Sequence, residues 1–231
     1  MILEVKNVVY YYKANKTRKI LDEVSYSFEN GKMYAILGAS GSGKTTFLSL
    51  LAGLDTPIAG EILYAGEDIR KKGLNYHRKN NISLVFQNYN LIDYLTPKEN
   101  VMLGGNKTAE KLLETVGIPM EDWNRKILQL SGGQQQRVAI ARALASSARV
   151  LLADEPTGNL DEEISKEIIK ILLDSAHELG KCVIVVTHSS EVASAADAII
   201  KINLGKITEE KTHKPYKEYA EILKNNDTII L

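Results

Sequence analysis

Cysteine is almost absent from this chain of 231 residues, because Cys182 is the only one. A single thiol excludes an internal disulfide and any zinc site built from several cysteines. Cys182 opens an apolar run that continues to Val186. We therefore expect it to be a small buried side chain rather than a reactive thiol.

Net charge and long apolar runs are also lacking. The 29 Lys+Arg balance 29 Asp+Glu, which gives no support for nucleic acid or an anionic membrane as the main partner. No apolar stretch approaches the roughly 20 residues that a membrane span requires. The N-terminus, Met1 to Val5, is typical of a strand rather than a signal peptide. We expect no nucleic-acid partner and no direct membrane span, so any membrane crossing would belong to another chain.

A glycine-rich stretch, GASGSGKT at 38–45, follows an apolar strand candidate at 33–37 and opens a helical pattern from 45 to about 52. This order is the context that the phosphate-binding pattern G-x-x-x-x-G-K-[ST] requires, and it disfavours a plain serine-capped turn. Backbone amides and the positive helix end favour a phosphate chain there. Lys44 is expected to reach the β- and γ-phosphates, and the Thr45 hydroxyl to ligate Mg²⁺. The predicted nucleotide-binding residues are Gly38, Ala39, Ser40, Gly41, Ser42, Gly43, Lys44, Thr45 and Thr46.

Alternating apolar and polar residues predict antiparallel strands over 1–28, with a hairpin at Lys13 to Lys19. Between 88 and 144 strand signals vanish and helical spacing takes over. Strands that alternate with helices elsewhere predict a mainly parallel α/β core. From Thr212 we expect a short helix and a loosely held end. Further strands are predicted at 61–64, 82–86, 150–153, 183–186 and 198–202.

Two adjacent carboxylates, Asp154 and Glu155, follow the apolar strand predicted at 150–153. The carboxyl end of a strand in an α/β sheet is where ligands bind. Asp154 is placed to hold the water shell of Mg²⁺. Glu155 is placed to orient or deprotonate an attacking water. A solvated strand end is the alternative, which the phosphate-binding loop upstream disfavours.

Residues 130–134, Leu-Ser-Gly-Gly-Gln, predict a second helix start with free amides near Gln134. Alone this would be an ordinary helix cap. In this order after the phosphate-binding loop, however, it resembles the signature motif of the ABC (ATP-binding-cassette) ATPases, a resemblance that covers about Ile2 to Gly205. The resemblance implies a P-loop ATPase fold that uses ATP and Mg²⁺ and releases ADP and phosphate. The implied single domain, 1–231, has an ATPase core with an antiparallel β subdomain (about 1–87 and 146–231) and an inserted helical subdomain (about 88–145).

The resemblance assigns roles to further residues. Gln87 resembles the glutamine that joins the metal site to the helical lobe, and His188 resembles the switch histidine that contacts the γ-phosphate. Asp161, in the stretch Gly158-Asn159-Leu160-Asp161, resembles the D-loop aspartate, and its position also predicts a helix N-cap. The implied catalytic residues are Lys44, Gln87, Glu155 and His188, and the implied metal residues are Thr45, Gln87 and Asp154.

Members of the family stack adenine on an aromatic side chain near the end of an early strand. Tyr10, Tyr11 and Tyr12 all compete for this role. Counting from Asn7-Val8 favours Tyr12, with Tyr11 as the second choice. Packing of the ring against the sheet is the alternative.

The family also implies partners. Two cassettes face head to tail, so that Ser131, Gly133 and Gln134 would serve the nucleotide of a second subunit, here expected to be an identical chain. A separate transmembrane permease is implied, with this chain at the cytoplasmic face of the cell membrane. Residues 54–57 and 157–161 resemble the group for lipoprotein release, macrolide export, cell division and antimicrobial-peptide resistance, which implies export or mechanical work. The segment 101–130 is shorter than in that group, and Ser189 replaces its common aspartate.

Two other functions fit the sequence less well. Soluble ABC ATPases that act on nucleic acid or ribosomes carry a coiled coil, a zinc module or a second cassette, for which this length, one cysteine and a single phosphate loop leave no place. A non-hydrolysing module would be expected to lack Glu155 or His188. Aromatic and apolar residues crowd the span after Gln87, which predicts that the membrane partner docks in a cleft at Asn88 to Asn100, with Tyr94 as an anchor.

Overall fold

The structure, a computed structural model, describes residues 1–12, 18–105, 108–158 and 160–211. The predicted hairpin at Lys13 to Lys19 falls largely outside these residues. The helix predicted after Thr212 and Asn159 of the D-loop stretch lie outside them entirely.

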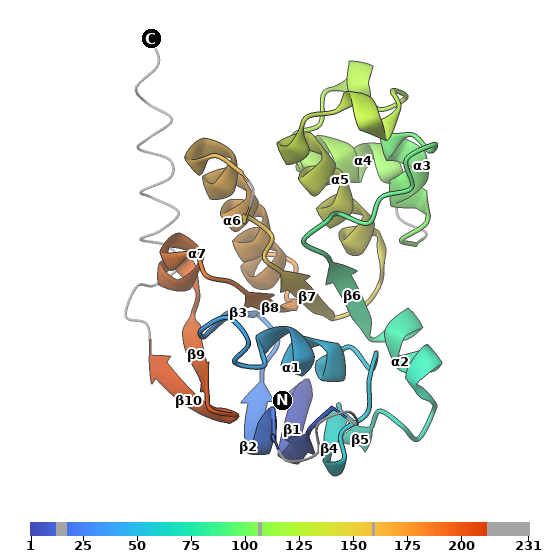
Figure 1. The fold of residues 1–231 in the computed structure, drawn as a ribbon. Helices are drawn as coiled ribbons and strands as arrows, with labels where there is room; N and C mark the ends of the chain where they lie inside the picture. The colour runs from blue at the N-terminus through green and yellow to red at the C-terminus, as the bar shows by residue number, and fades with distance from the viewer. Residues whose placement is uncertain (13–17, 106–107, 159, 212–231) are drawn as a thin grey trace.

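Two sheets form the lower part of the molecule in Figure 1. The smaller has the strand order β2-β1-β4-β5 and is antiparallel. It contains β1 (Leu3–Tyr10), β2 (Leu21–Phe28), β4 (Ala59–Tyr64) and β5 (Glu67–Asp68). This is the predicted N-terminal antiparallel β subdomain, to which β5 is an unpredicted addition.

The larger sheet has the order β10-β9-β3-β8-β7-β6. All its neighbours pair in parallel except β10 with β9. Its strands are β3 (Lys32–Leu37), β6 (Ile82–Val85), β7 (Val150–Asp154), β8 (Cys182–Val186), β9 (Ala198–Asn203) and β10 (Lys206–Lys211). The predicted mixed, mainly parallel α/β class is confirmed.

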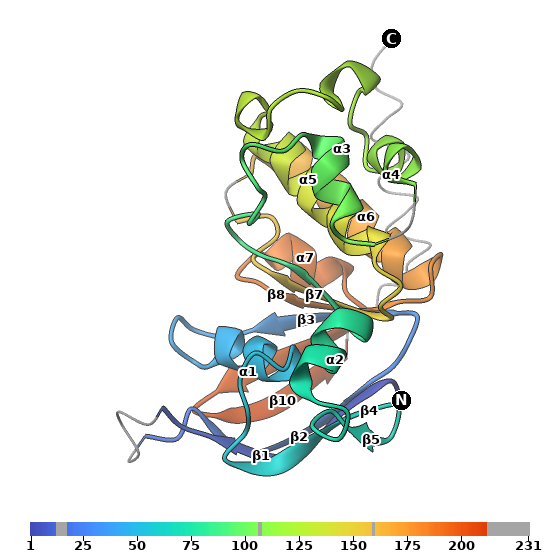
Figure 2. The ribbon, with the colours of Figure 1, turned by 90° about the vertical axis from the view of Figure 1, so that its right-hand side faces the viewer.

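The apolar runs of this sheet are buried on both faces. Along β3, Met33 and Ala35 pack into one core cluster while Tyr34 and Ile36 pack into the other. Helix α1 (Lys44–Leu51) lies between the two sheets and supplies Phe47 to the second cluster (Figure 2). The alternation follows from the strand period of two, and it explains why these strands are almost wholly apolar.

The remaining helices cover the opposite face of the large sheet, apart from α2 (Leu74–Asn80), which precedes β6. They are α3 (Pro97–Met102), α4 (Ala109–Thr115), α5 (Gly132–Ala145), α6 (Glu162–His177) and α7 (Ser190–Ala195), with short 3-10 turns at Met120–Asp122 and Ile127–Gln129. Figure 1 shows α3, α4 and α5 gathered above β6 and β7, where a helical insertion was predicted. Within the described residues, no helix is long and apolar enough to cross a membrane.

Candidate functional site

Eight of the predicted phosphate, metal and catalytic residues line one cavity of about 690 Å³, and the other predicted phosphate-loop residues, Gly38, Ala39, Ser42, Gly43 and Thr46, do not line it. It lies where β3, β6, β7 and β8 reach their carboxyl ends, the usual place for a ligand in a parallel sheet. The predicted residues that line it are Ser40, Gly41, Lys44, Thr45, Gln87, Asp154, Glu155 and His188. Segments far apart in the sequence thus form one site.

Glycine is required at two places in the loop that borders this cavity. A Cβ at Gly38 would lie 2.5 Å from the carbonyl oxygen of Ile202. Gly43 caps α1 with φ of 104°, a left-handed conformation that other residues rarely adopt. The first bond of α1 runs from the Phe47 amide to the Gly43 carbonyl, at 2.8 Å. The amides of the preceding helix residues therefore lack intrahelical partners and are available to an anion.

Lys44 is 7% exposed, and its ammonium is held inside the loop. Nζ donates to the carbonyl oxygens of Gly38 at 2.8 Å and Ala39 at 3.2 Å, and it lies 3.1 Å from His188 Nε2. Because an ammonium only donates, a hydrogen bond at this contact would require His188 Nε2 to accept. Lys44 would have to exchange some of these contacts for phosphate oxygens.

The carboxylate at the end of β7 is set in a partly buried environment. Burial raises the pKa of Asp154 and the charge of Glu155 raises it further, while the Thr45 hydroxyl, which is hydrogen-bonded to Asp154, and the Lys44 charge oppose the shift. A divalent cation here would favour the ionised carboxylate. Thr45, Asp154 and Gln87 offer hydroxyl, carboxylate and amide oxygens to the same cavity, and oxygens are the ligands that Mg²⁺ prefers. These residues fit the predicted ion.

The carboxylate of Glu155 lies in contact with His188. Its φ of 45° is left-handed, which is uncommon for a residue with a side chain. Its Oε2 accepts from the His188 amide at 3.2 Å, and its Oε1 lies 3.6 Å from His188 Nε2. A carboxylate and an imidazole therefore share the cavity with the ammonium of Lys44, an arrangement able to handle a water and a charged phosphate.

The three competing tyrosines have different surroundings. Tyr10 is 5% exposed and its hydroxyl donates to Asp55, so its ring is not open to a base. Tyr12 is 51% exposed, and its hydroxyl lies 2.8 Å from Thr46 Oγ1 in α1, directly beyond the phosphate loop. This geometry favours Tyr12 over Tyr10 as the adenine platform.

The signature residues lie outside the cavity, and Ser131 and Gln134 form hydrogen bonds with each other. Ser131 Oγ accepts from the Gln134 amide at 3.3 Å, and Gln134 Oε1 accepts from the Ser131 amide at 2.9 Å. Together they cap α5, as the serine predicted. Asp161 likewise caps α6 by accepting from the Ile164 amide at 2.9 Å. Neither Ser131, Gly133, Gln134 nor Asp161 lines the cavity of its own chain.

Gly133 has a packing role of its own. A Cβ there would lie 2.8 Å from the Cδ1 and Cγ2 atoms of Ile164, whereas a Cβ at Gly132 would lie 3.2 Å from the Tyr89 hydroxyl, the end of a longer side chain. We expect Gly133→Ala to lower the free energy of unfolding by about 1–3 kcal/mol through overpacking. Urea denaturation without nucleotide measures this. Gly132→Ala is the matched control, expected to change stability far less, and equal effects would show that contact with Ile164 does not restrict position 133.

Sequence reasoning missed several residues of the site. Glu162, Ser165 and Glu191 line the same cavity from the first turns of α6 and α7. Their signal was positional, because both helices start just after a parallel strand ends. Arg142 was also missed. It donates to the carbonyl oxygens of Tyr89 at 2.8 Å and Asn90 at 2.6 Å, and so holds the segment that follows Gln87.

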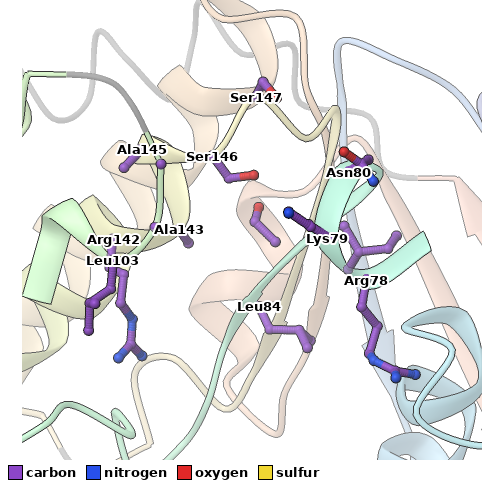
Figure 3. A pocket seen from close by; sticks show the side chains of 14 residues that line it. Arg78, Lys79, Asn80, Leu84, Leu103, Arg142, Ala143, Ala145, Ser146 and Ser147 are labelled. Carbon is purple, nitrogen blue, oxygen red and sulfur yellow. The ribbon is translucent and has the colours of Figure 1, made fainter. Parts of the chain in front are cut away.

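A second cavity of about 710 Å³ opens between α2 and β6 on one side and α3 and α5 on the other (Figure 3). We name it the docking cleft after the role that we propose for it. The span Asn88 to Asn100, where we expected a cleft, contributes none of its lining, although Tyr94 is 81% exposed. Docking of the partner at Asn88 to Asn100 stays a prediction. Residues that line the docking cleft include Arg78, Lys79, Leu84, Leu103, Arg142 and Ser146.

Comparisons with known proteins identify the family. The family described as ABC transporter matches residues 21–158. An uncharacterized ABC transporter ATP-binding protein, YclH of Bacillus subtilis (strain 168), is 45% identical over 217 residues, 90% of this chain and 96% of that protein. The macrolide export ATP-binding/permease protein MacB of Bartonella henselae is 36% identical over 250 residues, 99% of this chain and 38% of that protein.

Solved structures share the whole fold. A dimeric structure of the ATP-binding cassette MJ0796, in a post-hydrolysis state bound to ADP and Pi, superposes with a TM-score of 0.83 at 36% identity. The alignment covers 93% of this chain and 100% of that one. The chain therefore belongs to the ABC transporter family, as an ATP-binding cassette that hydrolyses ATP.

Proposed function

We propose that this chain dimerises head to tail on Mg-ATP and drives a separate membrane protein from the cytoplasmic face of the cell membrane. The proposal rests on one observation: the predicted nucleotide-binding residues lie in two separate places on the chain. The phosphate loop, Glu155 and His188 share one cavity, while the signature at Ser131 caps a helix outside it. A second copy would bring its signature to this nucleotide. The MJ0796 cassette, which binds ADP and Pi, was solved as a dimer.

The residues of the cavity divide the proposed chemistry among them. Mg²⁺, held by Thr45 and Asp154 with Gln87 beside them, would neutralise charge on the phosphates. Lys44 binds the β- and γ-phosphates, and His188 contacts the γ-phosphate. Glu155 orients the attacking water and takes its proton. All of these side chains line the same cavity.

Export or mechanical handling of peptides, lipoproteins or drugs is the proposed work. It is supported by the relatives named macrolide export ATP-binding/permease proteins, of which this chain covers the cassette, 38% of the length in Bartonella henselae. In such a protein the rest of the chain holds the permease of its name. The permease of the present cassette is proposed to be a different polypeptide.

The docking cleft is the proposed contact with that polypeptide. Lys79 directs its ammonium into it, whereas the guanidinium of Arg78 is turned away and donates to Gly53 and Asn75. Leu84 and Leu103 bring apolar surface. Leu103 is 58% exposed and so presents apolar surface to a partner. A short helix with an apolar face and an acidic residue would be complementary.

Arg142 connects this cleft to the nucleotide cavity. Its side chain lines the cleft, and its guanidinium holds the carbonyl oxygens of Tyr89 and Asn90. Both residues have left-handed backbone, with φ of 60° and 46°. Such a conformation persists only where its surroundings hold it. Because Gln87 precedes this segment, a helix in the cleft would be sensed at the metal site through Arg142.

Assembly with the membrane chain tests the docking cleft. A Lys79→Glu, Leu103→Asp double variant should lose about ten-fold or more of its affinity for the permease, because it opposes both the charge and the apolar surface. Its ATPase activity without the partner should persist. Co-purification from detergent-solubilised membranes of the source cells measures assembly, and Lys170→Glu on the exposed face of α6 is the matched control. The docking cleft is wrong if the double variant assembles like the control.

The same experiment distinguishes the transporter role from the competing function. A soluble ABC ATPase acting on nucleic acid or ribosomes would recover RNA or ribosomal proteins in place of a membrane-spanning chain. Such a result would overturn the transporter role and leave the ATPase activity in place.

A further inference from the structure

The ring of Tyr12 is not held by the sheet. Strand β1 ends at Tyr10, so residues 11 and 12 lie beyond its ladder. Two contacts fix the Tyr12 ring. Its edge-to-face partner is Tyr10, with centroids 5.4 Å apart and planes at 88°. Its hydroxyl lies 2.8 Å from Thr46 Oγ1.

Tyr10 is fixed far more firmly than Tyr12. Its carbonyl oxygen accepts from the Ile20 amide at 2.8 Å, and its side chain is 5% exposed. Its hydroxyl donates to Asp55 Oδ2. Burial and the Asp55 carboxylate raise the pKa of Tyr10 to about 12, so the phenol remains a donor at neutral pH.

Asp55 is in turn held by the loop that follows α1. Its Oδ1 accepts from the Thr56 amide at 2.7 Å. Two backbone bonds fix the ends of this loop, from Leu54 N to Ser49 O at 2.9 Å and from Ile58 N to Val9 O at 2.9 Å. The loop therefore joins the end of the phosphate-loop helix to β1, and Asp55 presents an acceptor at a set position.

We propose that Asp55 and Tyr10 are positioning residues for Tyr12 and thereby set how tightly the chain binds the base of its nucleotide. The inference rests on the proposed role of Tyr12 as the adenine platform. Asp55 fixes the Tyr10 ring, and the Tyr10 ring fixes the plane of Tyr12.

The two contacts of Tyr12 differ in what nucleotide binding does to them. Thr46 is itself a predicted phosphate-binding residue. Bound phosphates would therefore compete with Tyr12 for its hydroxyl. The contact with Tyr10 involves no predicted phosphate ligand and is available throughout. A ring already oriented by its neighbour loses less freedom when a base stacks on it, and that difference appears as affinity.

The experiment uses the full chain carrying Glu155→Gln, so that ATP is not consumed. Calorimetric titration gives the Kd of Mg-ATP and of magnesium tripolyphosphate, a probe that has the phosphates but no base. Tyr10→Phe and Asp55→Ala should each weaken Mg-ATP by about 3- to 10-fold, because each removes the hydrogen bond that orients the Tyr10 ring. Neither should change the Kd of tripolyphosphate.

Three further variants sharpen the result. Asp55→Asn keeps an oxygen that can accept from Tyr10 and should restore affinity to within about twofold of the parent. The Tyr10→Phe, Asp55→Ala double variant should be no weaker than either single variant, because both remove one contact. Tyr12→Ala tests the platform itself and should weaken Mg-ATP at least as much.

The outcomes are distinct. If Tyr12→Ala weakens ATP while Tyr10→Phe and Asp55→Ala do not, the platform stands and the positioning inference is overturned. If Tyr12→Ala has no effect, the platform and the inference fall together. Equal weakening of tripolyphosphate would place the effect in the phosphate loop and would also overturn the inference.

Discussion

A Glu155→Gln chain should bind Mg-ATP and hydrolyse it at least about 100-fold more slowly than the parent, the usual effect of removing a catalytic base. The amide keeps the size of the side chain and an oxygen that can still accept from the His188 amide, as Oε2 does at 3.2 Å. What it loses is the charge that would draw a proton from water. Steady-state phosphate release measures the effect.

The control for this variant is Glu163→Gln. Glu163 is an exposed carboxylate in the first turn of α6 and is not part of the cavity lining. It should hydrolyse ATP at the parental rate. Turnover by Glu155→Gln within a few-fold of that rate would exclude Glu155 as the residue that handles the water.

The second large effect concerns the exchange of sites between two chains. Lys44→Ala removes the ammonium of the phosphate loop, and Ser131→Arg places a bulky cation at the signature. When a covalently linked dimer carries one substitution on each chain, one composite site remains intact. When both substitutions are on the same chain, each composite site contains a lesion. We expect the split arrangement to retain about one occluded ATP per linked dimer and the combined arrangement to retain almost none.

Ser131→Ala separates the cap from the signature in this experiment. Ser131 caps α5, and loss of the cap alone costs about 1 kcal/mol of stability. A linked dimer with Ser131→Ala in place of Ser131→Arg should still occlude ATP. Equal occlusion by the split and combined arrangements would refute the head-to-tail geometry.

The features that could be predicted from the sequence are those that a few consecutive residues determine. The phosphate loop, the carboxylates at the end of β7 and the caps at Ser131 and Asp161 are each specified by a few consecutive side chains, and the structure has them where they were expected. The period of two and the apolar composition were enough to place the parallel strands. Convergence of Lys44, Gln87, Glu155 and His188 followed from the rule that strand ends meet at one edge.

Other features could not be found in this way because their signal is weak or dispersed. Helix α2 buries only His77, so it has no apolar period to detect. Strand β10 has the polar sequence KITEEK and pairs only at the sheet edge with β9. The docking cleft combines residues from segments near 80, 104 and 145, and no local sequence pattern predicts that these segments come together. Counting along the first strand already favoured Tyr12, and the structure adds that Tyr10 is buried and bonded to Asp55.

The central claim is that ATP closes two copies of this chain on each other before hydrolysis. Sedimentation of the Glu155→Gln chain, with and without Mg-ATP, tests it most directly. We predict a monomer without nucleotide and a dimer with saturating Mg-ATP, and a return to monomer when Ser131→Arg is added to the same chain. A Glu155→Gln chain that binds ATP and stays monomeric at micromolar protein would contradict the account.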